Sequence, residues 1–302
     1  MMKKNYFIGV DGGGTKTQIR LESEDGKVLG EGLAGPANIR LSVDVAINSI
    51  VSAFEQALQI ANLTEMRFSD EVQFHVGMGL AGYEVHSVRE EFLAKQKGLG
   101  FAHCHIQSDA FVACLGAHSG NYGSIIICGT GVVGLKYAKK GKFQVGGWGF
   151  PHGDEGGAAW LGLEAIRKTL HLCDGRGIES PLLLHIKKKL GDKVESVTEW
   201  ACYANATKYA ELARDVFKFA EEKDSIALYL LNNAATHIEK IFFALDKVEN
   251  ETKIKLPCSL VGGVSQFILP LLKPNIKKRL VPARGDACDG ALLMIREKYN
   301  QS

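Results

Sequence analysis

The sequence lacks the features of a disulfide-bonded, zinc-binding or membrane-spanning protein. Its seven cysteines are odd in number, and no two of them form a C-x-x-C pair. This pattern argues against a disulfide framework and against a zinc ribbon. No apolar run approaches the roughly 20 residues that a helix needs to span a bilayer. Basic residues exceed acidic ones by only 36 − 34 = 2, so we expect neither a nucleic-acid partner nor a membrane partner.

The cellular location can be inferred from the start of the chain and from its cysteines. The stretch MMKKNYFIGVDGGG carries two lysines, but its apolar segment is too short for a signal peptide. Most cysteines lie in apolar runs, as is typical of small buried side chains in a reducing compartment. We therefore expect a cytoplasmic protein. With 302 residues, 46% of them hydrophobic, the chain can form two globular domains.

The apolar patterns predict two successive sets of strands and helices. The first set has strands at NYFIGVD, TQIRLES and GKVLGEGLA, an amphipathic helix from about Ser42, a strand at EVQFHVGMGLAG, a charged helix, a strand at AHCHIQSD and a short helix at DAFVACLGAH. The second set has a strand at YGSIIICGTG, the alternating stretch VVGLKYAKKGKFQVGG, a helical stretch from 207 to 248, a strand at CSLVGGVSQF and a closing helix at DACDGALLMIREKY. Each set begins with a hairpin and a glycine-rich turn, which places the domain boundary near residues 116–120.

The segment GTGVVG matches the G-x-G-x-x-G spacing of a dinucleotide-binding loop. Such a loop must lead directly into a helix whose N-terminus receives the pyrophosphate. After Gly134 the sequence LKYAKKGKFQV has the period of a strand, not of a helix. We therefore reject a nicotinamide-dinucleotide site, and the Walker A pattern G-x-x-x-x-G-K-[ST] is also absent.

Three glycine runs remain, and they are candidates for phosphate contacts: Gly12-Gly13-Gly14, Gly129-Thr130-Gly131 and Gly262-Gly263. Successive glycines allow backbone N–H groups to gather around an anion without obstruction by a Cβ. The hydroxyls of Thr15, Thr17 and Thr130 and the charge of Lys16 could add to such a site. Each run alone could equally be an ordinary hairpin turn. Their order, with Asp11 at the end of the first strand, favours phosphate binding.

Five segments in this order resemble the actin, hexokinase and heat-shock chaperone ATPase superfamily. VDGGGTKT resembles its first phosphate loop, SDAFVACLGAH the first connecting segment, ICGTGVVG the second phosphate loop, LVGGVSQF the adenosine segment and GDACDGALL the second connecting helix. The resemblance implies an α/β fold of two ribonuclease H-like domains with a nucleotide cleft between them. The implied domains are 1–117, completed by the closing helix 286–302, and 118–285, which carries a helical insert.

The stretch GGWGFPHGDEGGAAWLG is the most specific part of the resemblance. It is similar to the N-acetylglucosamine kinases and bacterial glucosamine kinases grouped with the BadF/BadG/BcrA/BcrD ATPases. The cysteine-rich zinc motif of the repressor-type sugar kinases is absent, which excludes that branch. The resemblance implies a homodimeric ATP-dependent kinase that phosphorylates the 6-hydroxyl of an amino sugar, with N-acetylglucosamine favoured and glucosamine second.

The same resemblance implies the residues that bind ATP and Mg²⁺ and those that act on the acceptor. Asp11 would hold Mg²⁺, and Asp109 would be the catalytic base, although spacing alone favours a helix cap at Asp109. The implied contacts to ATP are Gly12, Gly13, Gly14, Thr15, Lys16, Thr17, Gly129, Thr130, Gly131, Gly262 and Gly263.

The implied contacts to the sugar come from four loops: Asn38, Ala81, Gly82, Asp109, Gly147, Trp148 and Asp154. Human-type members of the family carry serine at the position of Ala81. Asp154 could instead belong to the charged first turn of the next helix. A competing hypothesis is an ATPase that activates a partner enzyme, such as a 2-hydroxyacyl-CoA dehydratase, through an iron–sulfur cluster. Cys128 and Cys173 are its candidate ligands, but they lack the surrounding motifs of those activators.

Overall fold

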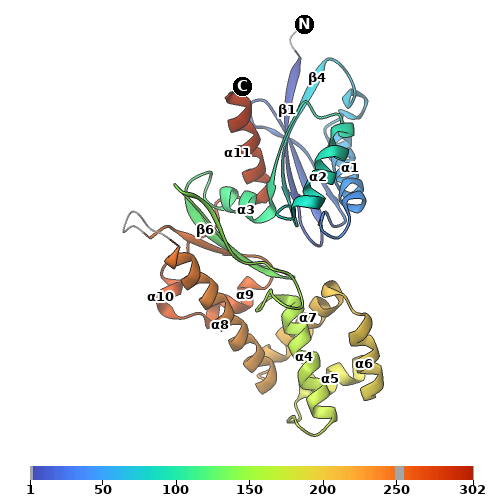
Figure 1. The fold of residues 1–302 in the computed structure, drawn as a ribbon, viewed down its shortest axis with the longest axis vertical. Coiled ribbons are helices and arrows are strands. Elements are labelled where there is room, and N and C mark those ends of the chain that lie inside the picture. The colour runs from blue at the N-terminus through green and yellow to red at the C-terminus, as the bar shows by residue number, and fades with distance from the viewer. Residues whose placement is uncertain (1–2, 249–254, 302) are drawn as a thin grey trace. The chain divides into compact units, whose positions relative to one another are not determined.

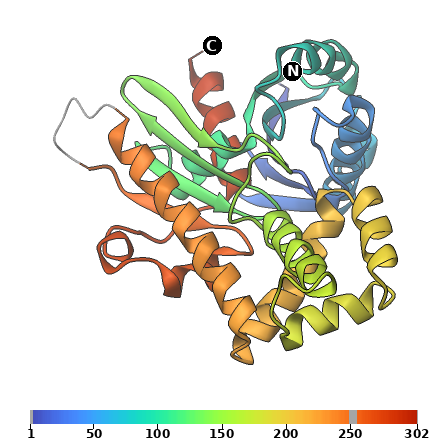
Figure 2. The same cartoon turned by 60° about the horizontal axis from the view of Figure 1, so that its bottom comes forward.

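A computed structural model describes residues 3–248 and 255–301 of the chain. The chain forms two compact units. The first consists of residues 1–123, 137–142 and 282–302, and the second consists of residues 124–136 and 143–281. In Figures 1 and 2 the colour follows the chain, so the first unit combines blue and teal elements with the dark red C-terminal helix. None of the described helices is both long enough and apolar enough to cross a membrane.

The first unit is built on a five-stranded sheet with the order β3-β2-β1-β4-β5. Its strands are β1 (Lys4–Gly12), β2 (Thr17–Ser23), β3 (Val28–Ala34), β4 (Val72–Leu80) and β5 (His103–Ser108). The first three strands are antiparallel, whereas β1, β4 and β5 run parallel. Because β1 is central and covered on both faces, its sequence is apolar almost throughout. The predicted strands of the first set are therefore confirmed.

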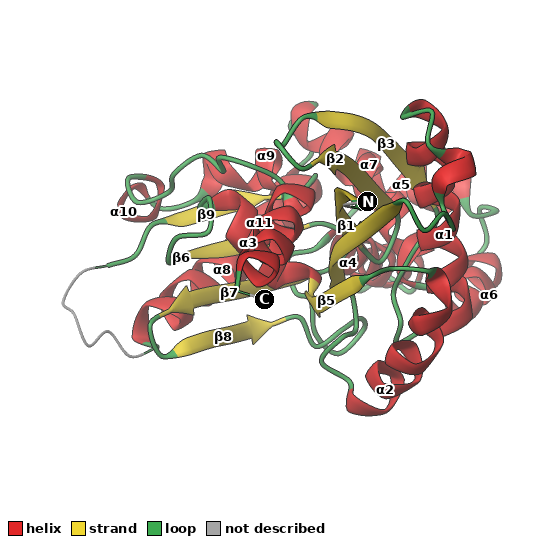
Figure 3. Cartoon of the chain, turned by 90° about the horizontal axis from the view of Figure 1, so that it is seen from above, coloured by secondary structure: helices red, strands yellow, loops and turns green. Residues whose placement is uncertain are grey.

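Helices cover both faces of this sheet. They are α1 (Val43–Ile60), α2 (His86–Lys95), α3 (Asp109–Ala117) and α11 (Ala287–Asn300), with 3-10 turns at Thr64–Met66 and Gln96–Leu99. Successive side chains of a strand point to opposite faces. Ile8 accordingly joins the core formed with α1, whereas its neighbour Phe7 packs against Leu292 and Ile295 of α11. Figure 3 shows α1 and α11 on opposite sides of the strands.

Glycines allow these helices to approach the sheet closely. A Cβ added at Gly32 of β3 would come 1.8 Å from the carbonyl oxygen of Ala53 in α1. On the other face, a Cβ added at Gly77 of β4 would come 2.0 Å from the carbonyl oxygen of Ala291 in α11. Neither position has room for a side chain, so the close packing of both helices depends on glycine.

The second sheet has four strands in the order β8-β7-β6-β9. They are β6 (Gly123–Cys128), β7 (Val132–Ala138), β8 (Gly141–Gly146) and β9 (Cys258–Val261), and β6 pairs with β9 in parallel. The tip of the β7–β8 hairpin, residues 137–142, belongs to the first unit. There Tyr137 packs edge-on against the rings of Phe111 and Tyr122, and Lys142 Nζ donates to Gln107 Oε1.

The helices of the second unit form its main apolar core. They are α4 (Ala158–Cys173), α5 (Pro181–Lys189), α6 (Val194–Tyr203), α7 (Ala206–Glu221), α8 (Ser225–Lys247), α9 (Ser265–Ile268) and α10 (Pro274–Lys277), with a 3-10 turn at Leu269–Leu271. The helical stretch predicted over 207–248 is divided between α7 and α8. Lys223 has φ +67°, and the Asp224 side chain accepts from the backbone N–H of Ala227 and caps α8. The left-handed residue ends one helix and the aspartate begins the next.

Candidate active site

Three loops of the first unit are joined by backbone hydrogen bonds at the glycine-rich turn between β1 and β2. Ala81 N–H donates to the carbonyl of Gly12 at 2.8 Å, and Ala37 N–H donates to the carbonyl of Gly13 at 3.0 Å. The turn itself is closed by a 3.0 Å bond from Gly13 N–H to the carbonyl of Lys16. Two consecutive carbonyls of the glycine run therefore point to the neighbouring loops.

The glycines of this turn differ in the space around them. A Cβ added at Gly12 would come 2.6 Å from Leu80 Cδ2, whereas one at Gly14 would meet no atom within 4 Å. Gly12 is thus required for packing, and Gly14 lies on the open side of the turn. The Thr17 side chain is fully buried and its hydroxyl donates to the carbonyl of Gly35 at 2.7 Å, so this threonine has a structural role in the turn.

Asp11 and Asp109 are the two carboxylates that the fold brings to this turn. Burial, followed by the negative charge of Asp109, raises the pKa of Asp11 to about 6, against the opposing effect of Lys16. Burial also raises the pKa of Asp109, and the charge of Glu84 adds to the shift. Two desolvated carboxyl groups that repel each other are stabilised by a cation. The carboxylate oxygens of Asp11 are ligands of the kind that Mg²⁺ accepts, so Asp11 fits a residue that holds a magnesium ion.

Asp109 is the first residue of α3, which lies close against β4. A Cβ added at Gly79 would come 3.2 Å from Asp109 Cα. Asp109 Oδ1 accepts from the backbone N–H of Ala110 at 2.8 Å, a bond to the next residue. The N-cap position belongs to Ser108, whose side chain makes no capping bond and whose buried Oγ has no partner among the described residues. The case for Asp109 as a helix cap is therefore weaker than it is from sequence alone.

The predicted sugar contacts of the first unit lie next to each other. Ile39 N–H donates to the carbonyl of Ala81 at 3.0 Å, which joins the two loops. Gly82 has φ +83°, and a Cβ there would come 2.8 Å from Asn38 Oδ1. Asn38, Ala81 and Gly82 are thus immediate neighbours, although they come from segments more than 40 residues apart in the sequence.

In the second unit, the loop of residues 129–131 is held by the N-terminus of α4. Ala158 N–H donates to the carbonyl of Gly129 at 2.9 Å, and Ala159 N–H donates to the carbonyl of Thr130 at 3.0 Å. The strand β7 follows this loop directly, which confirms the rejection of a dinucleotide fingerprint. The first turn of α4 still reaches the loop, but from a later part of the chain.

The loop that contains Gly147, Trp148 and Asp154 lies against the same glycines. A Cβ added at Gly131 would come 2.3 Å from Asp154 Oδ2. Asp154 has φ +64°, and its Oδ1 accepts from the backbone N–H of Gly149 at 3.3 Å. Since α4 begins only at Ala158, Asp154 does not belong to its first turn. Trp148 is 65% exposed, so its ring is accessible to a ligand.

The third glycine run lies next to the second within this unit. Gly262 follows β9 with φ +97°, and a Cβ there would come 2.3 Å from the carbonyl oxygen of Cys128. Val264 N–H donates to that same carbonyl at 3.0 Å. A Cβ at Gly263 would meet nothing within 4 Å. The runs 129–131 and 262–263 therefore gather at the ends of the parallel strands β6 and β9, which is where α/β sheets bind ligands.

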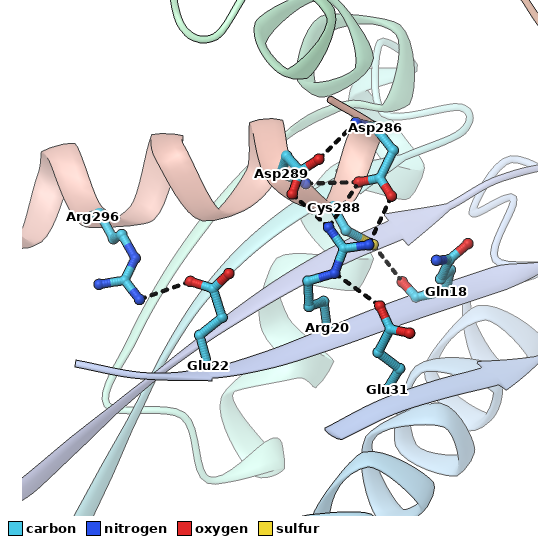
Figure 4. Close-up of polar contacts among 8 residues, drawn as sticks. All are labelled: Gln18, Arg20, Glu22, Glu31, Asp286, Cys288, Asp289 and Arg296. Carbon is cyan, nitrogen blue, oxygen red and sulfur yellow. Dashed lines mark hydrogen bonds and ion pairs between the residues drawn. The ribbon is translucent and has the colours of Figure 1, made fainter. Parts of the chain in front are cut away.

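A polar network on β2 anchors α11 (Figure 4). Arg20 donates to Glu31 at 2.8 Å, to Asp286 at 2.9 Å and to Asp289 at 2.5 Å. Asp286 caps α11 and forms a capping box with Asp289. The charge of Asp286 also raises the pKa of Asp11 slightly. Sequence reasoning missed Arg20, because its partners at 286 and 289 lie at the far end of the chain.

The described residues give no support to an iron–sulfur cluster or to a transition-metal site. Within residues 3–248 and 255–301, no group of three histidine, cysteine, aspartate or glutamate side chains could hold such an ion. Cys128 is fully buried, and this burial raises the pKa of its thiol to about 12. His103 bonds its Nδ1 to that of His75 at 3.0 Å, which is a structural contact.

Comparison with known proteins identifies the family of the chain. The profile of the BadF/BadG/BcrA/BcrD ATPase family matches residues 8–287. Glucosamine kinase GspK of Vibrio cholerae is 34% identical over 96% of this chain and 95% of its own. The N-acetylmuramic acid/N-acetylglucosamine kinase of Clostridium acetobutylicum is 28% identical over 97% and 99%.

Solved structures show the same similarity. A crystal structure from Chromobacterium violaceum, assigned as an N-acetylglucosamine kinase, has 34% identity and a TM-score of 0.87 over 97% of this chain and 99% of its own. A ROK family glucokinase from Streptomyces griseus, at 16% identity and a TM-score of 0.55, shares only the fold. These likenesses confirm the predicted α/β fold of the actin and hexokinase type.

Proposed function

Because the chain belongs to the BadF/BadG/BcrA/BcrD ATPase family, we propose that it transfers the γ-phosphoryl group of ATP to the 6-hydroxyl of an amino sugar. N-acetylglucosamine is the favoured acceptor and glucosamine the second. One observation carries the proposal: the loops of Asn38 and Ala81 are bonded to the Gly12–Gly14 turn, and Asp109 lies against Gly79, the register partner of Asp11. Relatives named as glucosamine and N-acetylglucosamine kinases support the choice of acceptor.

Asp109 is proposed as the general base. Its carboxylate would accept the proton of the 6-hydroxyl as that oxygen forms its bond to the γ-phosphorus and the bond to the β-phosphate oxygen breaks. Burial raises the pKa of Asp109, which makes its carboxylate a better proton acceptor. Its position at the start of α3, fixed by the close contact with Gly79, keeps the carboxyl group in one place.

Backbone amides are proposed to bind the phosphates. The carbonyls of Gly12 and Gly13 are already engaged by neighbouring loops, which fixes the turn for ligand contacts by Gly14, Thr15 and Lys16. Gly129, Thr130 and Gly131 would act in the same way, with Gly262 and Gly263 next to the adenosine. Mg²⁺, when bound, would neutralise charge on the phosphates, and Asp11 would hold it, generally through water.

Sugar recognition is proposed for Asn38, Ala81, Gly82 and the loop of residues 147–154. Asp154 would accept hydrogen bonds from ring hydroxyls, and the exposed Trp148 would contact the sugar ring. Ala81 is 8% exposed and offers a methyl group without a hydroxyl, so its side chain could reach the 2-substituent only through van der Waals contact. We further propose that the protein acts as a cytoplasmic homodimer, without a nucleic-acid or membrane partner.

A kinase assay coupled to ADP production tests this proposal. N-acetylglucosamine, glucosamine, N-acetylmannosamine and glucose would be compared as acceptors, and the phosphorylated carbon would be assigned by NMR. We expect ADP production that depends on the hexosamine and a product phosphorylated at carbon 6. ATP hydrolysis that no hexosamine accelerates would contradict the proposal. Iron and a brown colour in anaerobically purified protein would instead favour the activator hypothesis with Cys128 and Cys173.

A further inference from the structure

Phe267 lies just beyond the glycine run 262–263, in the short helix α9. Val264 N–H donates to the carbonyl of Cys128 at 3.0 Å, and Ser265 N–H donates to the carbonyl of Gly262 at 3.1 Å. Phe267 N–H donates in turn to the carbonyl of Val264 at 3.1 Å. The backbone of Phe267 is therefore fixed to Gly262 and to the end of β6, where the two glycine runs of this unit meet.

The ring of Phe267 lies face to face on the ring of Phe217, which comes from α7. The two centroids are 3.8 Å apart and the ring planes differ by 3°. The faces of phenyl rings repel each other, so such pairs prefer an offset or an edge-on arrangement. Elsewhere in this unit, for example, Trp200 and Tyr209 meet at 70°. The parallel arrangement is therefore imposed by the positions of α7 and α9 rather than by attraction between the two rings.

The surroundings of the two rings differ. Phe217 packs against the main apolar core of the second unit. Phe267 follows Gly263 closely, and a Cβ added at Gly263 would meet no atom within 4 Å. Both rings are half-buried, so the stack extends from the core to the surface. The open space at Gly263 leaves room for a ligand group between the glycine loops and the ring of Phe267.

A flat aromatic face close to a phosphate-binding loop matches the base of a nucleotide. Every base has a π face, and stacking on an aromatic side chain stabilises its binding. The proposed function, on which this inference rests, has Gly262 and Gly263 next to the adenosine. We propose that the face of Phe267 turned away from Phe217 stacks on the adenine of ATP. The ribose would then occupy the space at Gly263, and Phe217 is a positioning residue that fixes the plane of the Phe267 ring.

Calorimetry with the complete chain and Mg²⁺ tests this proposal by comparing two ligands that differ in the base. ADP carries adenine, whereas inorganic triphosphate has no base, and its affinity is measured by competition against ADP. Phe267→Ala should raise Kd for ADP by about 10- to 100-fold, the range for one lost base stack. Kd for triphosphate should stay at the wild-type value. Phe267→Tyr keeps the aromatic face and should bind ADP as the wild type does.

Two further variants test the role of Phe217 and the position of the ring. Phe217→Leu keeps an apolar side chain in the core but removes the supporting ring. Its loss of ADP affinity should be smaller than that of Phe267→Ala, with the affinity for triphosphate unchanged. Phe243→Ala is the matched control, since it removes a 37% exposed ring of α8 that meets Phe242 edge-on at 85°. It should bind both ligands as the wild type does.

The outcomes distinguish failure of this inference from failure of the proposed function. Wild-type affinity for ADP in Phe267→Ala would overturn the stacking role. Equal losses for ADP and triphosphate would also overturn it, because the ring would then only support the phosphate loops. Neither result affects the kinase proposal, since neither measures phosphoryl transfer. Ring-dependent ADP binding without phosphorylation of any hexosamine would contradict the proposed function alone, and a wild-type protein that does not bind ADP would contradict both.

Discussion

The carboxylate of Asp154 lies directly against Gly131, so that a Cβ added at Gly131 would come 2.3 Å from Asp154 Oδ2. This contact joins a residue proposed to bind the sugar to a residue proposed to bind a phosphate. Both positions are held further by the N-terminus of α4, which bonds the carbonyls of Gly129 and Thr130. The loop of residues 129–131 and the loop of residues 147–154 are therefore packed together.

The first prediction concerns this contact. Gly131→Ala should displace Asp154 and lower kcat/KM for the amino sugar by about 100-fold, the effect expected of a misplacement near 1 Å. Steady-state kinetics with the sugar varied would measure it. Gly98→Ala is the matched control, since a Cβ there meets nothing within 4 Å, and its activity should equal that of the wild type. Unchanged kinetics in Gly131→Ala would show that the Asp154 position does not matter for turnover.

The second prediction concerns Asp109. Asp109→Asn keeps the size of the side chain and its ability to accept from Ala110 N–H, but it cannot accept the proton of the acceptor hydroxyl. We expect kcat to fall by about 10²- to 10⁴-fold, the usual contribution of a positioned base. Nucleotide affinity, measured by calorimetry, should stay close to the wild-type value. Near-normal turnover would remove Asp109 from the role of base.

The third prediction concerns the pH dependence of stability. His75 is fully buried on β4, and burial, with a smaller effect from His103, lowers its pKa to about 4, against 6.5 for an unfolded histidine. The unfolded chain therefore binds a proton between these values and the folded one does not. Above pH 6.5 the protonation of His75 does not lower the free energy of unfolding. Below pH 6.5 the free energy of unfolding decreases as the pH falls towards 4.

The lowered pKa of His75 corresponds to a loss of at most about 3 kcal/mol in the free energy of unfolding. Urea unfolding at pH 7 and pH 4.5 should show a smaller loss of stability in His75→Gln than in the wild type. His86→Gln removes a largely exposed histidine and should keep the wild-type dependence. An identical dependence in His75→Gln and the wild type would contradict this assignment.

The fourth prediction concerns Arg20, which is bonded to three carboxylates. Its side chain is 16% exposed, whereas the partners are 40% exposed or more. Arg20→Met leaves these negative charges without their common cation, and we expect a loss of about 2 kcal/mol, below the range for fully buried pairs. Chemical denaturation would measure it. Arg176→Met breaks the exposed pair with Asp174 and should leave the stability close to that of the wild type. Equal losses would mean that the Arg20 network acts as an ordinary surface pair.

Local patterns were sufficient to predict most strands and the order of the loops. The strands β1 and β2 could be predicted because the sequence pattern of each follows its burial. β1 is apolar and buried almost throughout, whereas buried and half-buried residues alternate in β2. The break at Lys223 was not predicted, since the sequence EEKDS combines good helix formers with a capping residue. Only the positive φ of Lys223 shows that the cap signal of Asp224 prevails over helix propensity.

Contacts between distant segments could not be predicted from the sequence. The bonds from Arg20 to Asp286 and Asp289 span more than 260 positions, and no periodicity connects them. Likewise, the contact between Asn38 and Gly82 depends on the register that places Gly12 opposite Leu80. The resemblance to a family implies the individual site residues, but only the structure shows which of these residues are in contact.

The position of α11 affects how the chain folds during synthesis. This helix is the last element of the chain, yet it covers the face of β1 and β4 at Gly9 and Gly77. A ribosome must therefore translate the whole second unit before the first can close its core. Until the final helix emerges, the apolar side chain of Phe7 stays uncovered, and a nascent chain stalled before residue 287 should bind chaperones through this surface.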